Sequence, residues 1–99
     1  MTALSEIVPK IRSKNAGPFW VTIDLFCERP DIFGRVSRGL ATDRVAARLG
    51  VATAAIRRFD LADLNVVKFS LPRPAVQGTV TDRDMHGASF ALCLLDLEI

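Results

Sequence analysis

The sequence predicts one small α/β domain over residues 1–99, of the α+β type in which a four-stranded sheet packs against short helices. Three observations support this prediction. A chain of 99 residues has room for one modest hydrophobic core. Several segments that are bounded by turn-forming residues show the side-chain alternation typical of strands. Two segments with helical spacing follow the first of these predicted strands.

The composition indicates that the domain has a partner. Hydrophobic residues make up 49% of the chain and the mean hydropathy is +0.26, so one small core leaves apolar side chains to cover. Self-association or docking onto a larger protein would cover them. The net charge of +2 is too small to indicate a nucleic-acid or membrane surface.

Charge is unevenly distributed along the chain. Ten Lys or Arg and five Asp or Glu precede Phe59, whereas three and six follow from there. Such a molecule can assemble head to tail or offer a basic face to an anion. Solvated faces that merely differ in charge would give the same pattern.

The two cysteines and the N-terminus predict a cytoplasmic protein. Cys27 and Cys93 lie in or beside apolar segments, and their spacing matches neither a disulfide framework nor a zinc site. Glu6 and Pro9 interrupt the segment in which a signal peptide would need continuous apolar residues. No segment is long enough to span a membrane, and we expect no membrane association.

The first element expected along the chain is a short helix over residues 3–12. Ser5 would cap it and Glu6 would lie near its positive end. Pro9 restrains that helix, and turn formers at residues 15–18 end it.

A strand is expected from Phe19 to Phe26, where β-branched and aromatic residues are dense. Large side chains occur on both of its faces, which predicts a central strand that is covered on both sides. Asp24 in that setting needs a partner.

Two helices should follow this strand. The first begins near Arg29-Pro30-Asp31 and ends at Gly39, and the second begins at Thr42 and ends at Gly50. Residues 43–58 also resemble a helix-turn-helix, with residues 53–58 as the recognition helix. That helix would offer mainly alanine to base edges, which favours a short helical turn leading into a strand and makes nucleic acid an unlikely partner.

Two strands over residues 56–61 and 66–71 should form a hairpin with a turn at residues 62–65. Pro72 and Pro74 close the second strand, because neither can donate to a ladder. Residues 75–88 are rich in loop formers and could be a loop or a helix. The pattern of residues 89–99 predicts a last strand.

The segments Arg12–Phe26, Leu71–Pro74 and Leu94–Ile99 together resemble a family of short bacterial proteins catalogued as a domain of unknown function. That family is similar to the ferredoxin-fold module associated with AtuA, the acyclic terpene utilisation protein. The resemblance implies a ferredoxin-like plait that stands beside an AtuA-like protein or is fused to its C-terminus in catabolic gene neighbourhoods. The resemblance carries over no catalytic residues. The expected element order fits a plait if residues 75–88 replace or shorten its second crossover helix.

One polar segment is the best candidate for a ligand site. Two cations, a hydroxyl, an amide and free backbone N–H groups occur within a few residues, and this set can hold a carboxylate or a phosphate. Arg73, held between two prolines, could complete the site. The alternative is a structural turn with solvated cations. The candidate ligand-binding residues are Arg12, Ser13, Lys14, Asn15, Gly17 and Arg73.

Candidates for catalysis or metal binding are weaker. Asp24 could pair with Arg12, Lys14 or Arg73, or act as a general base, and His86 is a second acid/base candidate. Acidic loop residues beside a single histidine can ligate a divalent cation, although they are more often simply solvated. The candidate metal ligands are Asp82, Asp84 and His86.

The leading functional hypothesis is therefore an accessory subunit or ligand-binding module that works with an AtuA-like protein, self-associates or both, and binds an anion at residues 12–18. The alternative is a small enzyme acting on an organic acid or acyl thioester, and a DNA-binding protein comes third. The sequence shows no nucleophile triad and no phosphate-loop motif. It leaves any cofactor undefined.

Overall fold

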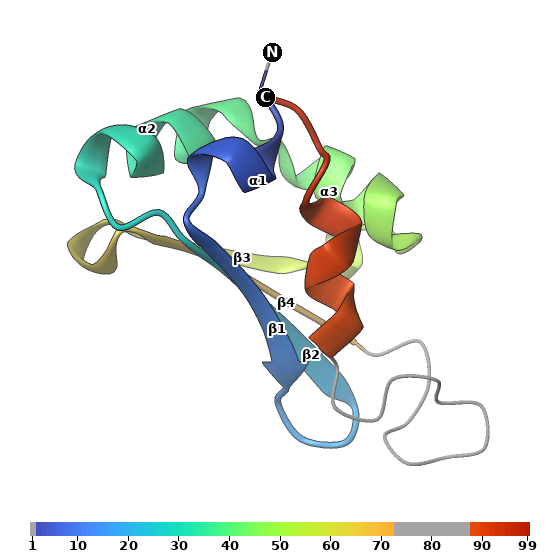
Figure 1. Cartoon of the computed structure of the whole chain (residues 1–99). Coiled ribbons are helices and arrows are strands. Elements are labelled where there is room, and N and C mark those ends of the chain that lie inside the picture. Colours follow the sequence, from blue (N-terminus) through green and yellow to red (C-terminus); the bar gives the residue numbers. More distant parts are fainter. Residues whose placement is uncertain (1, 73–87) are drawn as a thin grey trace.

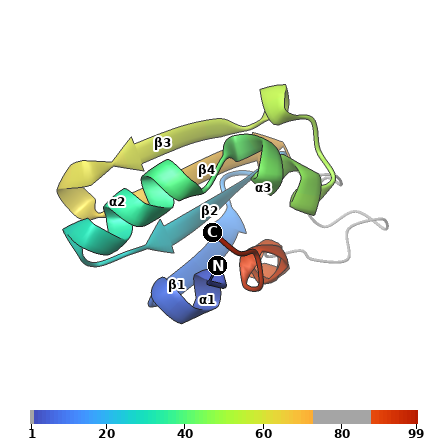
Figure 2. The same cartoon turned by 90° about the horizontal axis from the view of Figure 1, so that it is seen from above.

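The computed structural model describes residues 2–72 and 88–99, with the α-helices and the C-terminal 3₁₀ helix on one side of a four-stranded antiparallel sheet (Figures 1 and 2). This arrangement confirms the predicted α+β class. The elements in chain order are α1 (Leu4–Ile7), β1 (Lys10–Asn15), β2 (Trp20–Phe26), α2 (Pro30–Gly39), α3 (Thr42–Leu49), η1 (Thr53–Ala55), β3 (Arg57–Leu61), η2 (Ala62–Leu64), β4 (Val66–Pro72) and η3 (Ala88–Leu94).

The strand order is β1-β2-β4-β3, and every neighbouring pair is antiparallel. Strands β2 and β3 are therefore parallel to each other, with β4 between them, and α2 and α3 connect them. This is the split β-α-β arrangement of a ferredoxin-like plait. The edge beside β2, which in that plait holds the last strand, is occupied here by the N-terminal strand β1.

The predicted helix over residues 3–12 is wrong beyond its first turn. α1 has 4 residues and ends before Pro9, and Ser5 lies inside it instead of capping it. Residues 10–15 then alternate between exposed and half-buried positions as β1, with Ile11 facing the helices. Pro9 prevents α1 from continuing. Residues 10–15 pair with β2 instead. The turn is confined to residues 16–19, where Gly17 has a φ of 82°.

The predicted strand over residues 89–99 is also wrong. Residues 88–94 form the 3₁₀ helix η3, and one bridge between Ala3 and Glu98 is the only strand-like pairing beyond it in the described part of the chain. Its buried residues Ala91 and Leu94 are three positions apart, which matches the three residues per turn of a 3₁₀ helix, and Leu97, buried beyond its end, continues the spacing. A run of apolar residues conceals this spacing when the sequence alone is considered.

The middle of the chain follows the prediction closely. α2 begins at Pro30 and ends at Gly39, and α3 ends at Gly50, whose φ of 73° provides a left-handed cap. The hairpin turn between β3 and β4 is η2 followed by Asn65. The helix-turn-helix alternative is wrong, because η1 has only 3 residues and leads directly into β3.

The core lies between the helices and one face of the sheet. Val21, Ile23 and Leu25 from β2 are 0% exposed, as are Val67 and Phe69 from β4. Within the described residues, β2 is covered on one side only, so the expected cover on both sides is not found there. No element of the described chain covers the opposite face, which carries Trp20, Thr22, Asp24 and Phe26 (Figure 1).

One charged network joins β3 to α2 on the covered side. The Arg58 guanidinium donates to the carbonyl oxygens of Ser37 and Leu40 at the end of α2 and pairs with Asp60 at 2.8 Å. Partial burial alone would raise the pKa of Asp60, but hydrogen bonds from Arg58 and Ser37 and the Arg58 charge outweigh it. The pKa of Asp60 is therefore lowered from its usual 3.8.

Candidate functional site

The face of the sheet that points away from the helices, here called the open face, is built from three cross-strand rows. Residues that pair directly across antiparallel strands place their side chains on the same face. The register gives a first row of Lys14, Thr22, Ser70 and Arg57, a second of Arg12, Asp24, Lys68 and Phe59, and a third of Lys10, Phe26, Val66 and Leu61.

The open face has a strong positive charge. Strand β1 contributes three cations, β3 and β4 contribute one each, and Asp24 is the one carboxylate in the three rows. Within the described chain, none of these five cations forms an ion pair. Their charge is therefore left for solvent or for a ligand to neutralise. The cations are Lys10, Arg12, Lys14, Arg57 and Lys68.

Aromatic rings lie among these cations. The Lys10 ammonium is 5.8 Å from the centre of the Phe26 ring, and the Arg57 guanidinium is 5.5 Å from that of Trp20. These cation–π contacts position the two cations on the open face and leave their positive charge intact. Phe59 is 45% exposed, and no described cation lies over its ring.

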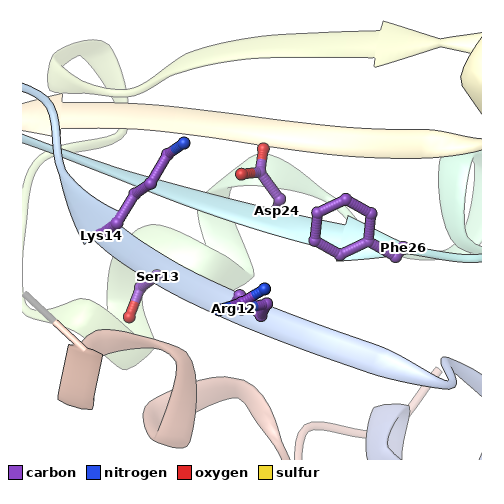
Figure 3. Close-up of a pocket in the computed structure, with 5 residues that line it drawn as sticks. All are labelled: Arg12, Ser13, Lys14, Asp24 and Phe26. Carbon is purple, nitrogen blue, oxygen red and sulfur yellow. The ribbon is translucent and has the colours of Figure 1, made fainter.

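A pocket of about 170 Å³ lies where β1 and β2 meet on this face. Its lining combines two cations, a carboxylate and an aromatic ring (Figure 3). Asp24 is half-buried and pairs across the strands with Arg12 on one side and Lys68 on the other. It forms no ion pair with any residue in the described ranges. The lining residues are Arg12, Ser13, Lys14, Asp24 and Phe26.

The structure brings together only some of the predicted ligand-binding residues. Arg12 and Lys14 share the open face with Asp24. Ser13 alternates to the other face, points towards η3 in Figure 3 and accepts a 2.9 Å hydrogen bond from the Ala91 backbone N–H. Asn15 ends β1, and Gly17 lies in the following turn and does not line the pocket.

The remaining predicted residues lie outside the described residues. They are Arg73, the catalytic candidate His86, and Asp82 and Asp84, which were predicted to join His86 as metal ligands. Within residues 2–72 and 88–99, no three His, Cys, Asp or Glu side chains gather closely enough to hold a metal ion.

Sequence reasoning missed several members of the open face. Lys10, Phe26, Arg57 and Lys68 come from four different strands, so only the pairing register unites them. The alternation of Lys10, Arg12 and Lys14 was a usable signal, because period-2 charge is typical of a strand with one solvated face.

Thr22 is a further member of the open face that sequence reasoning missed. It is 6% exposed, and its hydroxyl has no hydrogen-bond partner among the residues described. The register places it directly between Lys14 and Ser70. A buried hydroxyl without a partner costs about 1–3 kcal/mol, so a bound acceptor at this row would be favoured.

Comparison with known protein families gave one match. A family model described as "Domain of unknown function (DUF4387)" matches residues 4–98. The chain belongs to this family. Searches of curated proteins and of solved structures gave no match.

In this member of the DUF4387 family, the open face offers cations and hydroxyls, whereas the Cys27 thiol belongs to the buried core. Burial raises the pKa of the Cys27 thiol to about 11, so this buried group stays protonated and poorly nucleophilic near neutral pH. Cations without ion pairs beside a hydroxyl are instead suited to a carboxylate or phosphate. No helix of the described chain has the length and hydropathy of a membrane span.

Proposed function

We propose that this chain is a ligand-binding accessory module whose open face takes up an organic anion. The observation that carries the proposal is the set of five cations that form no ion pair with any described residue, opposed by one carboxylate in the three rows. Mutual repulsion of like charges on one surface is relieved when an anion binds. The pocket beside Arg12 and Lys14 provides a concave point of contact for a carboxylate or a phosphate group.

The proposed protein partner is an AtuA-like catabolic protein, with self-association as a further possibility. The identity of the proposed partner rests on the family resemblance, whereas the expectation that the chain has a partner rests on its composition. Phe59 and Leu64 are 45% and 67% exposed, so apolar surface is available for docking.

A fluorescence titration tests the ligand-binding proposal. The chain has 1 Trp and no Tyr, and that Trp20 lies beside the open face under Arg57, so its emission reports on this surface. We expect saturable responses to inorganic phosphate and to acetate that weaken as salt is added. Lys14→Ala should weaken binding about tenfold, the effect of losing one charge-assisted contact.

The matched control is Arg44→Ala, which removes an exposed cation from α3 in the helical layer. It should bind both anions like the wild type. If Lys14→Ala and Arg44→Ala weakened anion binding equally, the loss would reflect net charge alone. That result would contradict a site on the open face.

The partner proposal has its own test. An AtuA-like protein from the same genome, co-expressed with this chain, should co-elute with it in size-exclusion chromatography. Separate elution of the two proteins at micromolar concentration would contradict the accessory role while leaving anion binding intact.

A second candidate function is a small enzyme in which Asp24 acts as general base on a bound organic acid or acyl thioester. The observation that favours it is that Asp24 lines the pocket and forms no ion pair with a residue that the structure describes. Asp24→Asn separates the two functions. A binding module should hold anions a few-fold more tightly once the opposing carboxylate is gone, whereas an enzyme should lose turnover.

A further inference from the structure

We infer that the anion taken up by the open face is amphipathic, with a carboxylate or phosphate group at the β1 cations and an apolar chain lying across the strands on Phe26, Val66 and Leu61. The inference rests on the proposed anion binding and specifies its ligand class. It is carried by the way in which polarity changes from one row of the open face to the next.

The three rows differ in chemistry. The first row holds the hydroxyls of Thr22 and Ser70 between two cations. The third row holds Phe26, Val66 and Leu61 at directly paired positions, with Val66 only 7% exposed between its two half-buried neighbours and Lys10 at the β1 end. A ligand that extends from the first row across the second to the third therefore meets hydrogen-bond donors at one end and hydrocarbon at the other.

The pocket is the point where these two environments meet. Arg12 and Lys14 form its cationic part and Phe26 forms its apolar wall. Its volume of about 170 Å³ is below the roughly 300–1,000 Å³ of pockets that enclose whole ligands. It suits a head group and a few carbons, so the remainder of the ligand must lie along the third row.

The geometry of the sheet sets the length of the apolar part. Adjacent strands lie about 4.8 Å apart, so the row extends about 10 Å from β2 to β3, the length of roughly eight methylene groups. At the β3 end, Phe59 of the second row is 45% exposed and lies beside Leu61. Its ring extends the apolar surface at that end.

Two other occupants fit this surface less well. A second copy placed face to face would oppose two sets of five cations, which repel each other. A single-stranded nucleic acid needs open aromatic faces for base stacking. The rings of Trp20 and Phe26 already carry Arg57 and Lys10 over one face each.

The test is a chain-length series followed by Trp20 fluorescence with the full-length protein. The ligands are straight-chain carboxylates from acetate to decanoate below their micellar concentrations, with alkyl phosphates as a second arm that identifies the preferred head group. A methylene laid on an open surface loses about half of its water contact, so affinity should rise about twofold per methylene. The rise should level off near eight carbons.

Two variants assign the effect to its residues. Phe26→Ala should retain the response to acetate and phosphate but lose most of the gain with chain length. The matched control Leu92→Ala removes a side chain that is 64% exposed on η3, in the helical layer, and should leave the series unchanged. Circular dichroism at each ligand concentration verifies that the fold is intact, and octanol, which lacks the charge, should bind far more weakly than octanoate.

The outcomes separate the two proposals. Equal affinity for acetate and octanoate would overturn the amphipathic ligand and leave anion binding in place. The same holds if Phe26→Ala preserves the full dependence on chain length. Absence of any response, to short and long anions alike, would overturn the proposed function itself.

Discussion

The two faces of this sheet use the same four strands for different purposes. On the covered face, Ile23, Leu25 and Phe69 are wholly buried under the helices. On the open face, the residues next to them in the strands are the carboxylate of Asp24, the cation of Lys68 and the hydroxyls of Thr22 and Ser70. Because successive side chains of a strand point to opposite faces, adjacent residues can serve stability and binding independently. Substitutions on the two faces should therefore have separable effects.

The largest expected effect is on the covered face. Phe69→Ala removes the largest fully buried side chain and leaves a cavity, which should lower the free energy of unfolding by about 3–5 kcal/mol. Urea denaturation measures this loss. Phe59→Ala, on β3 of the open face, is the matched control and should cost far less. Similar losses for both would contradict the division between the faces.

Adjacent arginines provide a sharper contrast. Arg58 holds the end of α2 from the covered side, whereas Arg57 lies on the open face over Trp20. Arg58→Ala should lower the free energy of unfolding by about 2–3 kcal/mol, because the carbonyl oxygens at the end of α2 lose their side-chain donor and Asp60 loses its cation. Arg57→Ala should change it by less than about 0.5 kcal/mol. The account fails if thermal unfolding ranks them in the opposite order.

Thr22 should show a smaller effect of the opposite sign. Thr22→Val removes a buried hydroxyl that has no partner among the described residues, so the free protein should gain about 1 kcal/mol. Anion binding should weaken in the same variant, since the first row loses a donor. Thr22→Ser, which keeps the hydroxyl, is the control for binding. A loss of stability in Thr22→Val would mean that the hydroxyl is satisfied in solution.

The smallest effect is a pH dependence on the covered side. The folded-state pKa of Asp60 is lower than its usual 3.8, so its ion pair with Arg58 stabilises the fold fully above that value. The contribution is lost as pH falls through the lowered folded-state pKa. Denaturation of wild type and Asp60→Asn between pH 5 and about pH 2 should show the difference between them shrinking. A constant difference across that range would exclude this linkage.

The sequence alone predicted the middle of the fold well. The strand that begins near Phe19, both helices and the hairpin at residues 62–65 carry strong local signals in caps, spacing and turn residues. Both ends of the chain were misassigned. There, four-residue α1 and the 3₁₀ helix η3 depend on packing against the sheet and not on local propensity.

The candidate site was predicted only where it was local in sequence. Arg12, Lys14 and Asp24 meet as one hairpin, so a short stretch of sequence revealed them. Lys68 and Arg57 join them through register between strands distant in the chain, and a shift of one residue would have moved each to the other face. No single-sequence pattern fixes that register.

The central claim is that the open face, and not the helical layer, receives the anion. The most direct test is an NMR titration of the ¹⁵N-labelled protein with octanoate, followed at every assigned amide and at the Trp20 indole N–H. We predict the largest shift changes in β1, β2 and the indole, with α2 and α3 unaffected. Changes concentrated around the exposed arginines of α2 and α3, namely Arg35, Arg38 and Arg44, would contradict the claim.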